Sequence, residues 1–239
     1  MTGLLGVAAQ SDWVFVANNA AYLLGGTVIT IALTVASVLL GLLVGFPAGV
    51  VEVYGDGLPK RAVKTVGVVL RGTPIVVLLI FAFFVFPTPD IPLGFFTIGG
   101  AFVAGVLGLG LRSAAYLSQV FRGALQSVDE GQMEAARSVG LSRFESIRYV
   151  VVPQALRRSM PGFQNEFTIV LKDTSIAFAI GLAELLTQGY NLFTQSGRST
   201  AVLEVFIVIS AIYFVLTFAT NRGLDRLSDH YAIPSGENT

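Results

Sequence analysis

Residues 13–51 read WVFVANNAAYLLGGTVITIALTVASVLLGLLVGFPAGVV, a run of 39 residues without Asp, Glu, Lys or Arg. Soluble domains do not carry such a run, whereas a membrane-spanning helix needs about 20 mostly apolar residues. The rest of the chain agrees, because 54% of its 239 residues are hydrophobic and 13% are charged, against roughly 25% charged in soluble proteins. The mean hydropathy is +0.74. The chain is therefore predicted to be a membrane protein.

The charge balance and the absence of cysteine exclude several functions. With 15 basic and 15 acidic residues the formal net charge is zero, so a general attraction to nucleic acid has no electrostatic basis. The lack of cysteine rules out disulfides and thiolate metal sites.

The apolar segments predict an all-α fold of about five transmembrane helices. One segment, residues 163–186, contains Glu166, Lys172, Asp173 and Glu184, so we expect the other helices to shield it from lipid. The five predicted spans are residues 22–46, 65–86, 95–117, 163–186 and 201–221.

The basic residues predict how these helices are oriented. Short cytoplasmic loops are enriched in Lys and Arg, and here the basic residues gather in 60–64, in 122–158 and after residue 221. The alternate connections contain only Arg198. We therefore expect the N-terminus outside and the C-terminus in the cytoplasm. This divides the chain into an outer segment (1–21), a transmembrane domain (22–222) and a cytoplasmic tail (223–239).

The cytoplasmic connection is predicted to contain a helical hairpin at about residues 127–152. Ser127 with Glu130, and Ser142 with Glu145, have the capping-box spacing that marks the start of a helix. Gly140 lies between the two predicted helices, where a left-handed cap favours glycine, and we expect Pro153 to interrupt the second helix. A folded hairpin here suggests a docking surface; the alternative is an ordinary amphipathic loop.

Other residues of the spans have structural interpretations. We expect the glycines of the first and third spans to allow close helix packing, and Pro74 either to kink the second span or to form its first turn. Arg71 is expected to extend toward the cytoplasmic headgroups. The glycines concerned are Gly41, Gly45, Gly105, Gly108 and Gly110.

The charged residues of the fourth span are the candidates for a solute path. On an unbroken helix, spacings of seven and eleven residues place Glu166, Asp173 and Glu184 within about 20° of one another. One hypothesis is that this face meets a polar solute; the alternative is that the charges pair between helices or lie at the membrane interfaces. A break at residues 173–175 would end the shared face. The candidate path residues are Lys172, Asp173, Thr174, Ser175 and Glu184.

The hairpin carries a recognisable pattern. Glu134-Ala135-Ala136, three residues, Gly140, nine residues and Val150-Val151-Val152-Pro153 resemble the EAA signature of ABC-importer permeases, which usually ends in Ile-x-Leu-Pro. Further stretches resemble the permeases of the polar amino acid uptake family. They are Arg71-Gly72-Thr73-Pro74, Ala115-Tyr116, Arg122-Gly123, Gly131-Gln132, Pro153-Gln154-Ala155 and Lys172-Asp173-Thr174-Ser175. One residue departs from the pattern, because Gln119 stands where the family usually has glutamate.

The resemblance implies a transport subunit in the cytoplasmic (inner) cell membrane with no catalytic residues and no metal site. Its hairpin would be the coupling helix that sits in a groove of an ATPase subunit. The partners implied are a dimer of ATP-binding subunits, a second permease copy or a sibling subunit, an extracytoplasmic solute-binding protein and a polar amino acid. This chain has no phosphate-binding loop, so ATP and Mg would be held by the ATPase. The implied ATPase contacts are Glu134, Ala135, Ala136, Gly140, Leu141 and Pro153.

Two other functions are compatible with a helical membrane protein. A secondary transporter driven by an ion gradient could use Asp173 or Glu184 as its ion site, although such folds usually need more spans and internal repeats. A membrane-anchored scaffold or receptor component would transport nothing.

Overall fold

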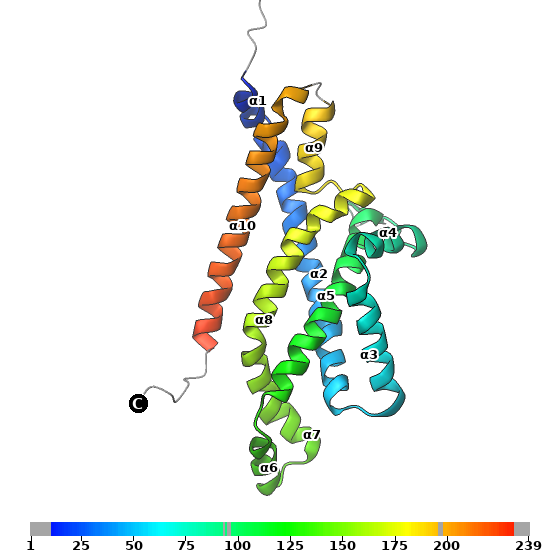
Figure 1. Cartoon of the computed structure of the whole chain (residues 1–239), viewed down its shortest axis with the longest axis vertical. Helices are drawn as coiled ribbons and strands as arrows, with labels where there is room; N and C mark the ends of the chain where they lie inside the picture. The colour runs from blue at the N-terminus through cyan, green and yellow to red at the C-terminus, as the bar shows by residue number, and fades with distance from the viewer. Residues whose placement is uncertain (1–10, 93, 95–96, 196–197, 232–239) are drawn as a thin grey trace, which may run out of the picture.

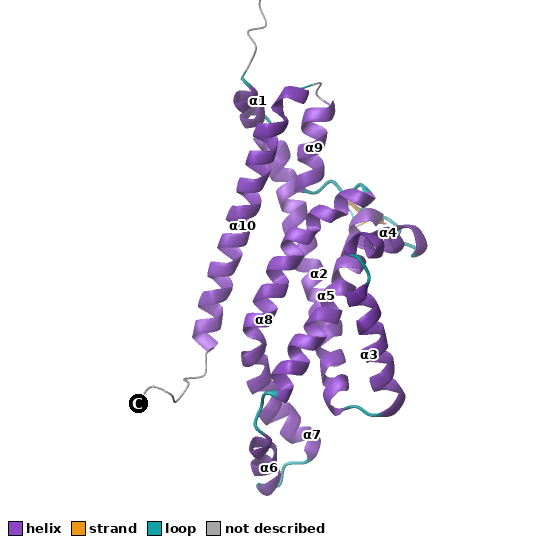
Figure 2. Ribbon diagram, viewed as in Figure 1, coloured by secondary structure: helices purple, strands orange, loops and turns teal. Residues whose placement is uncertain are grey.

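The computed structural model describes residues 11–92, 94, 97–195 and 198–231. Residues 1–10 of the predicted outer segment and 232–239 of the predicted tail lie outside the described residues. The α-helices are α1 Asp12–Asn18, α2 Ala20–Tyr54, α3 Gly57–Gly72, α4 Ile75–Val85, α5 Gly100–Gln126, α6 Glu130–Ser138, α7 Arg143–Ser146, α8 Val152–Asp173, α9 Leu185–Gln195 and α10 Val202–Tyr231. Two short strands, β1 Ile91–Pro92 and β2 Thr97–Ile98, pair antiparallel. Helix thus dominates the described chain (Figure 2), as the sequence predicts.

Within the described part of the chain, three helical segments are long and apolar enough to cross a membrane. They are α2, α5 and residues 199–227, which contain most of α10; the bent pair α3 and α4 would make a fourth. The predicted count of about five also needs the segment 163–186, which the structure breaks into pieces.

The long helices α2 and α5 pack closely along most of their length (Figure 1). A stripe of glycines on α2 permits this, since a Cβ atom at Gly45 would lie 2.7 Å from the carbonyl oxygen of Ala114. Cβ atoms at Gly41 and Gly49 would come within 2.9 Å of Ser113 and Ser118. The predicted packing role is also confirmed for Gly105, Gly108 and Gly110 of α5, where an added Cβ would approach Leu33, Leu79 and Leu40 within 3.0 Å. Gly49 was not predicted.

The second predicted span is two helices rather than one. α3 and α4 meet at an angle of 108°, and Pro74 is the N-cap residue of α4, in keeping with a proline that cannot continue a helix. The expectation that Arg71 extends to the headgroups is wrong, because its Nη1 donates a hydrogen bond of 2.7 Å to the carbonyl oxygen of Ala115 on α5.

The third predicted span is shifted along the chain. Its predicted start, residues 95 and 96, lies outside the described residues. The next two residues form β2, and α5 begins only at Gly100, whose N–H donates to the carboxylate of Asp90 at 2.7 Å. At the other end α5 continues to Gln126, nine residues beyond the predicted end. α5 therefore leads directly into the hairpin.

The fourth predicted span is not one continuous helix. α8 ends at Asp173, a 3₁₀ helix covers Thr174–Ile180, and Gly181 follows with φ +71°. The chain then turns into α9, so the prediction that Glu184 shares a helix face with Glu166 and Asp173 is wrong. The alternative of a break at residues 173–175 describes the structure.

The elements are arranged with two distinct ends. Figure 1 shows α6, α7 and the connection between α2 and α3 at one end, with α1 and α9 at the other. The C-terminal end of α10 points toward the hairpin end. The segments rich in Lys and Arg therefore lie toward the same end, as the charge pattern predicts.

Candidate functional site

The hairpin begins with a capped helix, although the capping residue differs from the predicted one. Asp129 is the N-cap of α6, and its carboxylate accepts a hydrogen bond from the N–H of Gly131 at 2.8 Å. The predicted capping box of Ser127 with Glu130 is wrong. Because α5 continues to Gln126, Ser127 ends that helix instead, and its hydroxyl donates to the carbonyl oxygen of Ala124.

Gly140 makes the turn between the two short helices. Its φ is +95°, in the left-handed region that residues with a Cβ atom seldom adopt. The N–H of Gly140 donates to the carbonyl oxygen of Arg137 at 3.1 Å, and the N–H of Leu141 donates to the carbonyl oxygen of Ala136 at 3.2 Å. This pair of hydrogen bonds is the Schellman motif, so the predicted left-handed cap is confirmed.

The second helix of the hairpin starts with the predicted capping box. Ser142 Oγ accepts from the N–H of Glu145, and the Glu145 carboxylate accepts from the N–H of Ser142 at 2.8 Å. Hydrogen bonds from the Ser142 side chain, and then from its backbone, lower the pKa of Glu145 below its ordinary value. Both helices of the hairpin are therefore held by local hydrogen bonds.

Pro153 changes the helix without ending it. α7 passes into a π-helical segment, Ile147–Val151, and then into α8. Proline has no N–H to donate, and the chain accommodates it near the first turn of α8, directly after the π segment. At the predicted interruption, the backbone changes from α-helical to π-helical hydrogen bonds over Ile147–Val151 and then returns to an α-helix.

The predicted coupling residues lie together on the hairpin and the start of α8. Glu134, Ala135, Gly140 and Pro153 are exposed, Leu141 is half-buried and Ala136 is buried. Sequence reasoning missed two apolar side chains, Val139, 80% exposed, and Phe144, 69% exposed. The signal was available, because a hairpin capped at Gly140 must place its neighbours at the tip.

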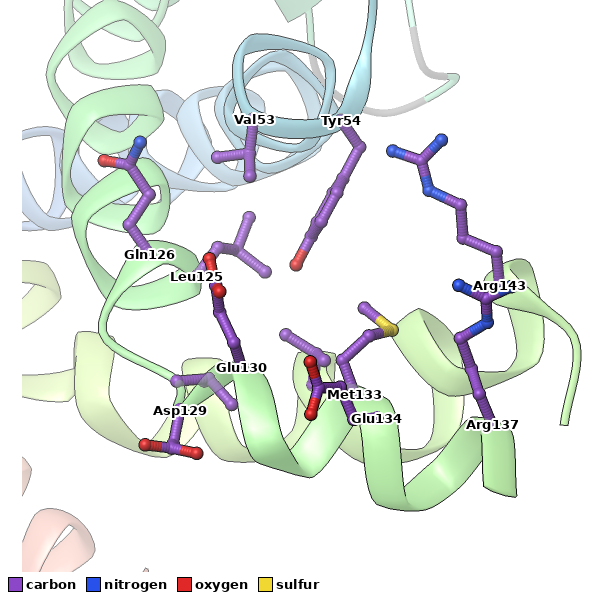
Figure 3. Close-up of a pocket in the computed structure, with 12 residues that line it drawn as sticks. Val53, Tyr54, Leu125, Gln126, Asp129, Glu130, Met133, Glu134, Arg137 and Arg143 are labelled. Atoms are coloured by element: carbon purple, nitrogen blue, oxygen red, sulfur yellow. The ribbon is translucent and has the colours of Figure 1, made fainter. Parts of the chain in front are cut away.

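A hollow of about 630 Å³ lies between α6 and the end of α2. Figure 3 shows Tyr54 pointing into it from α2, with acidic side chains of α6 on one side and the guanidinium groups of Arg137 and Arg143 on the other. Both signs of charge therefore rim an open hollow beside the exposed hairpin. Its lining is Val53, Tyr54, Leu125, Gln126, Val128, Asp129, Glu130, Met133, Glu134, Arg137, Arg143 and Val151.

A second polar cluster lies where α8 ends against α5. Asp173 forms an ion pair of 2.8 Å with Arg112, and both side chains are about one-fifth exposed. The Arg112 guanidinium also lies 4.8 Å from the ring centroid of Tyr116. Sequence reasoning missed Arg112, although an arginine within an apolar span signals a charged partner in another helix.

The other predicted path residues differ in exposure. Lys172 is exposed and Ser175 is half-buried, with its hydroxyl donating to the Lys172 carbonyl at 2.8 Å. Thr174 is fully buried. Glu166 is 4% exposed, and its Oε1 makes no direct hydrogen bond to the described residues. The accessible side chains of this cluster are thus Lys172, Asp173, Ser175 and Arg112.

Glu184 lies apart from this cluster and is bound within the protein. Its carboxylate is fully buried and accepts hydrogen bonds from the N–H groups of Leu186 and Thr187, from the Thr187 hydroxyl and from Tyr213 OH, at 2.7–3.0 Å. It therefore ties the start of α9 to α10. Within the described residues, no group of three or more His, Cys, Asp or Glu could hold a metal ion.

Gln119, the residue that departs from the family pattern, has a partner on another helix. Its Nε2 donates to both carboxylate oxygens of Glu52 on α2, at 2.9 and 3.0 Å. Arg122 Nη1 lies 3.9 Å from the same carboxylate. Sequence reasoning missed Glu52.

Comparison with known proteins gives one consistent result. The chain is 34% identical over 220 residues to the glutamine transport system permease protein GlnP of Escherichia coli (strain K12), covering 91% of this chain and 96% of that protein. It is 34% identical over 189 residues to the L-cystine transport system permease protein TcyL of Bacillus subtilis (strain 168), covering 79% and 78%.

A solved structure agrees with these relatives. The crystal structure of an amino acid ABC transporter with histidines contains a chain that matches with a TM-score of 0.78 and 31% identity, covering 92% of this chain and 99% of that chain. The family described as "Binding-protein-dependent transport system inner membrane component" matches residues 37–230, which include α5, the hairpin, α8 and nearly all of α10. The protein belongs to this family of membrane transport permeases.

Proposed function

We propose that this chain is the membrane-embedded subunit of an ATP-driven importer for a polar amino acid, and that its hairpin docks on an ATP-binding subunit. The observation that carries the proposal is the hairpin itself, with a hydrogen-bonded cap at the start of each helix and the Gly140 turn between them. The relatives named for glutamine and L-cystine support an amino acid as solute.

The docking surface combines a rigid frame with exposed apolar and charged groups. Val139 and Phe144 project from the tip, and an apolar group on an ordered frame binds a partner at a low entropic cost. The hollow beside α6, with carboxylates and guanidinium groups on its rim, offers charge complementarity to a partner surface. Glu134, Ala135, Ala136, Gly140 and Leu141 form or support this surface, and Pro153 lies at its base.

The proposed assembly contains two permease subunits, either two copies of this chain or this chain with a sibling. Two ATP-binding subunits hold ATP and Mg on the cytoplasmic side, and a solute-binding protein delivers the amino acid on the outer side. The protein lies in the inner cell membrane with about five spans, the N-terminus outside and the C-terminus in the cytoplasm. The gathering of the basic segments at the hairpin end supports this orientation.

The proposed solute path runs past the end of α8. Backbone that leaves the α-helix at membrane depth is tolerated where it is buried in protein or lines a cavity, and α8 becomes a 3₁₀ helix directly after Asp173. A zwitterionic amino acid carries an ammonium and a carboxylate group, which match in sign the Asp173 carboxylate and the two basic side chains beside it, Lys172 and the paired Arg112. Ser175 adds a hydroxyl, while Thr174 and Glu184 hold the surrounding backbone in place.

The transport cycle follows from the docking. ATP binding draws the two ATP-binding subunits together, and the hairpins move with them. Because α5 and α8 flank the hairpin in the chain, they change their tilt and open the path to the outer side. ATP hydrolysis then restores the inward-facing state.

Reconstitution tests the proposal. Liposomes that contain this chain with the ATP-binding subunit and the solute-binding protein of the proposed importer should accumulate glutamine or cystine only when ATP is enclosed with the ATP-binding subunit. The Gly140→Val variant should abolish accumulation while it still inserts in the membrane. Uptake without ATP that collapses with an uncoupler would identify a secondary transporter instead, and complexes that never move solute would identify a scaffold.

A further inference from the structure

Glu52 is a carboxylate buried between the two most closely packed helices. Its side chain is 1% exposed, and it lies in the last turn of α2. Ser118 Oγ lies 3.3 Å from its Oε1, and Gln119 Nε2 lies within 3.0 Å of both oxygens. Arg122 Nη1 donates to Gln119 Oε1 at 3.3 Å, which places its charge at the edge of the same group.

The partners of Glu52 all come from one turn of α5. Burying a carboxylate is costly unless hydrogen bonds and an opposite charge compensate it. Ser118, Gln119 and Arg122 supply that compensation from residues more than 60 positions away in the sequence. The cluster therefore joins α2 to α5 at a defined register.

Gln119 is the central partner of Glu52 in this cluster, because its amide donates to both carboxylate oxygens. Here the carboxylate stands across the interface on α2, and the amide stands on α5. We propose that the contact of Glu52 with Gln119 and Arg122 is a latch that fixes the hairpin-side ends of α2 and α5 to each other, with Glu52 as the acidic partner of Arg122.

The position of this Glu52–Gln119 latch assigns it a mechanical role, which rests on the proposed docking of the hairpin. α5 ends at Gln126, just before α6, and Val53 and Tyr54 of α2 line the hollow beside α6. On the N-terminal side of Glu52, the glycine stripe of α2 (Gly41, Gly45 and Gly49) already packs closely against α5. With the latch at the cytoplasmic end, α2 and α5 form one lever, and displacement of the hairpin moves both. Glu52 is thus a positioning residue for energy coupling.

A charge-exchange cycle tests the latch. The complex is reconstituted with wild-type chain, Glu52→Gln, Gln119→Glu and the double variant, and uptake per ATP hydrolysed is measured together with the thermal midpoint. We expect each single variant to lower uptake per ATP by about fivefold, a coupling effect of the size that neighbouring residues show. The double variant restores the original set of groups in exchanged positions and should return to within about twofold of wild type.

Asp56→Asn is the matched control. Asp56 lies four residues after Glu52 and is exposed, so its substitution removes a nearby carboxylate without touching the latch and should leave uptake per ATP unchanged. Single variants that transport like wild type, or a double variant no better than the weaker single variant, would overturn the latch. A wild-type complex without ATP-dependent uptake would overturn the proposed function and the latch with it.

Discussion

At the scale of single residues, the turn at Gly140 depends on one backbone angle. A Cβ atom added there would meet nothing within 4 Å, so any cost of substitution comes from the φ of +95° and not from a collision. Left-handed conformations cost residues with a Cβ atom roughly 1–2 kcal/mol, and β-branched residues tolerate them least. Asparagine adopts them more readily.

We therefore predict that Gly140→Val disrupts the hairpin and abolishes ATP-dependent uptake, whereas Gly140→Asn keeps most of it. Initial uptake rates in reconstituted liposomes measure the difference. Gly223→Val is the control, because Gly223 lies inside α10 and an added Cβ also meets nothing within 4 Å. Equal uptake by Gly140→Val and Gly140→Asn would show that the left-handed turn is unimportant.

Residues whose roles are local were predictable from the sequence. The cap at Gly140 and the Ser142–Glu145 box depend on neighbours within a few positions. Ser127 was wrongly predicted to cap the start of the hairpin. Because α5 continues to Gln126, Ser127 ends that helix and Asp129 caps α6 instead. The Arg112–Asp173 pair and the Glu52–Gln119 latch were missed, since each joins residues more than 60 positions apart and appears only when the helices are packed.

At the scale of elements, the capping box makes the hairpin sensitive to mutation and to pH. Loss of an N-cap serine typically costs about 1 kcal/mol, so Ser142→Ala should raise amide exchange in residues 142–146. The lowered pKa of Glu145 sets the sign of the pH effect. A carboxyl group whose pKa is lower in the folded than in the unfolded state stabilises the fold at pH values above its unfolded pKa, which is 4.5 for Glu145. This stabilisation is lost as the pH falls toward the folded pKa.

Hydrogen exchange measured by mass spectrometry, corrected for intrinsic rates, checks both statements. In the wild type, protection of residues 142–146 should decline as the pH falls below about 4.5. In Ser142→Ala this decline should be largely absent, because the bonds that lower the pKa are gone. A decline of the same size in both proteins would mean that the box does not hold the helix.

The glycine stripe of α2 gives a matched pair of substitutions on one helix. Gly45→Ala places a Cβ 2.7 Å from the Ala114 carbonyl oxygen, and overpacking of this kind costs about 1–3 kcal/mol. At Gly25 the nearest atom is 4.0 Å away on the Gln188 side chain, so Gly25→Ala should be neutral or slightly stabilising. Thermal unfolding in detergent distinguishes them, and equal midpoints would contradict the account of helix packing.

Elements were predictable where apolar runs are uninterrupted. The first and fifth predicted spans correspond to α2 and α10, because neither predicted segment contains a proline and only one charged residue, Glu204, lies within them. The second and fourth spans contain the breaks. Pro74 was recognised as a kink or a first turn, but periodicity does not fix the 108° angle between α3 and α4. The break after Asp173 was an open alternative, since only the packing of α8 against α5 shows where the helix stops.

At the scale of the whole molecule, the positions of the charged residues indicate how the protein is oriented in the membrane, whereas the net charge does not. The net charge is zero, yet the basic connections gather toward the hairpin end of the structure (Figure 1). That polarity underlies the proposed orientation, and the orientation in turn places the hairpin where an ATP-binding subunit can reach it.

The chain is well suited to a direct test of this arrangement, because it has no cysteine. Val139→Cys places a single thiol at the tip of the hairpin, where the native side chain is 80% exposed. Thr194→Cys, at an exposed position of α9 at the opposite end, is the matched control. A membrane-impermeant maleimide is applied to intact cells and to inverted membrane vesicles, with and without the ATP-binding subunit.

We expect the thiol at position 139 to react only in inverted vesicles and to be protected when the ATP-binding subunit is bound, while the thiol at position 194 reacts only in intact cells. Labelling of position 139 from outside the cell, or labelling that is indifferent to the ATP-binding subunit, would contradict the claim that this hairpin is the cytoplasmic docking element.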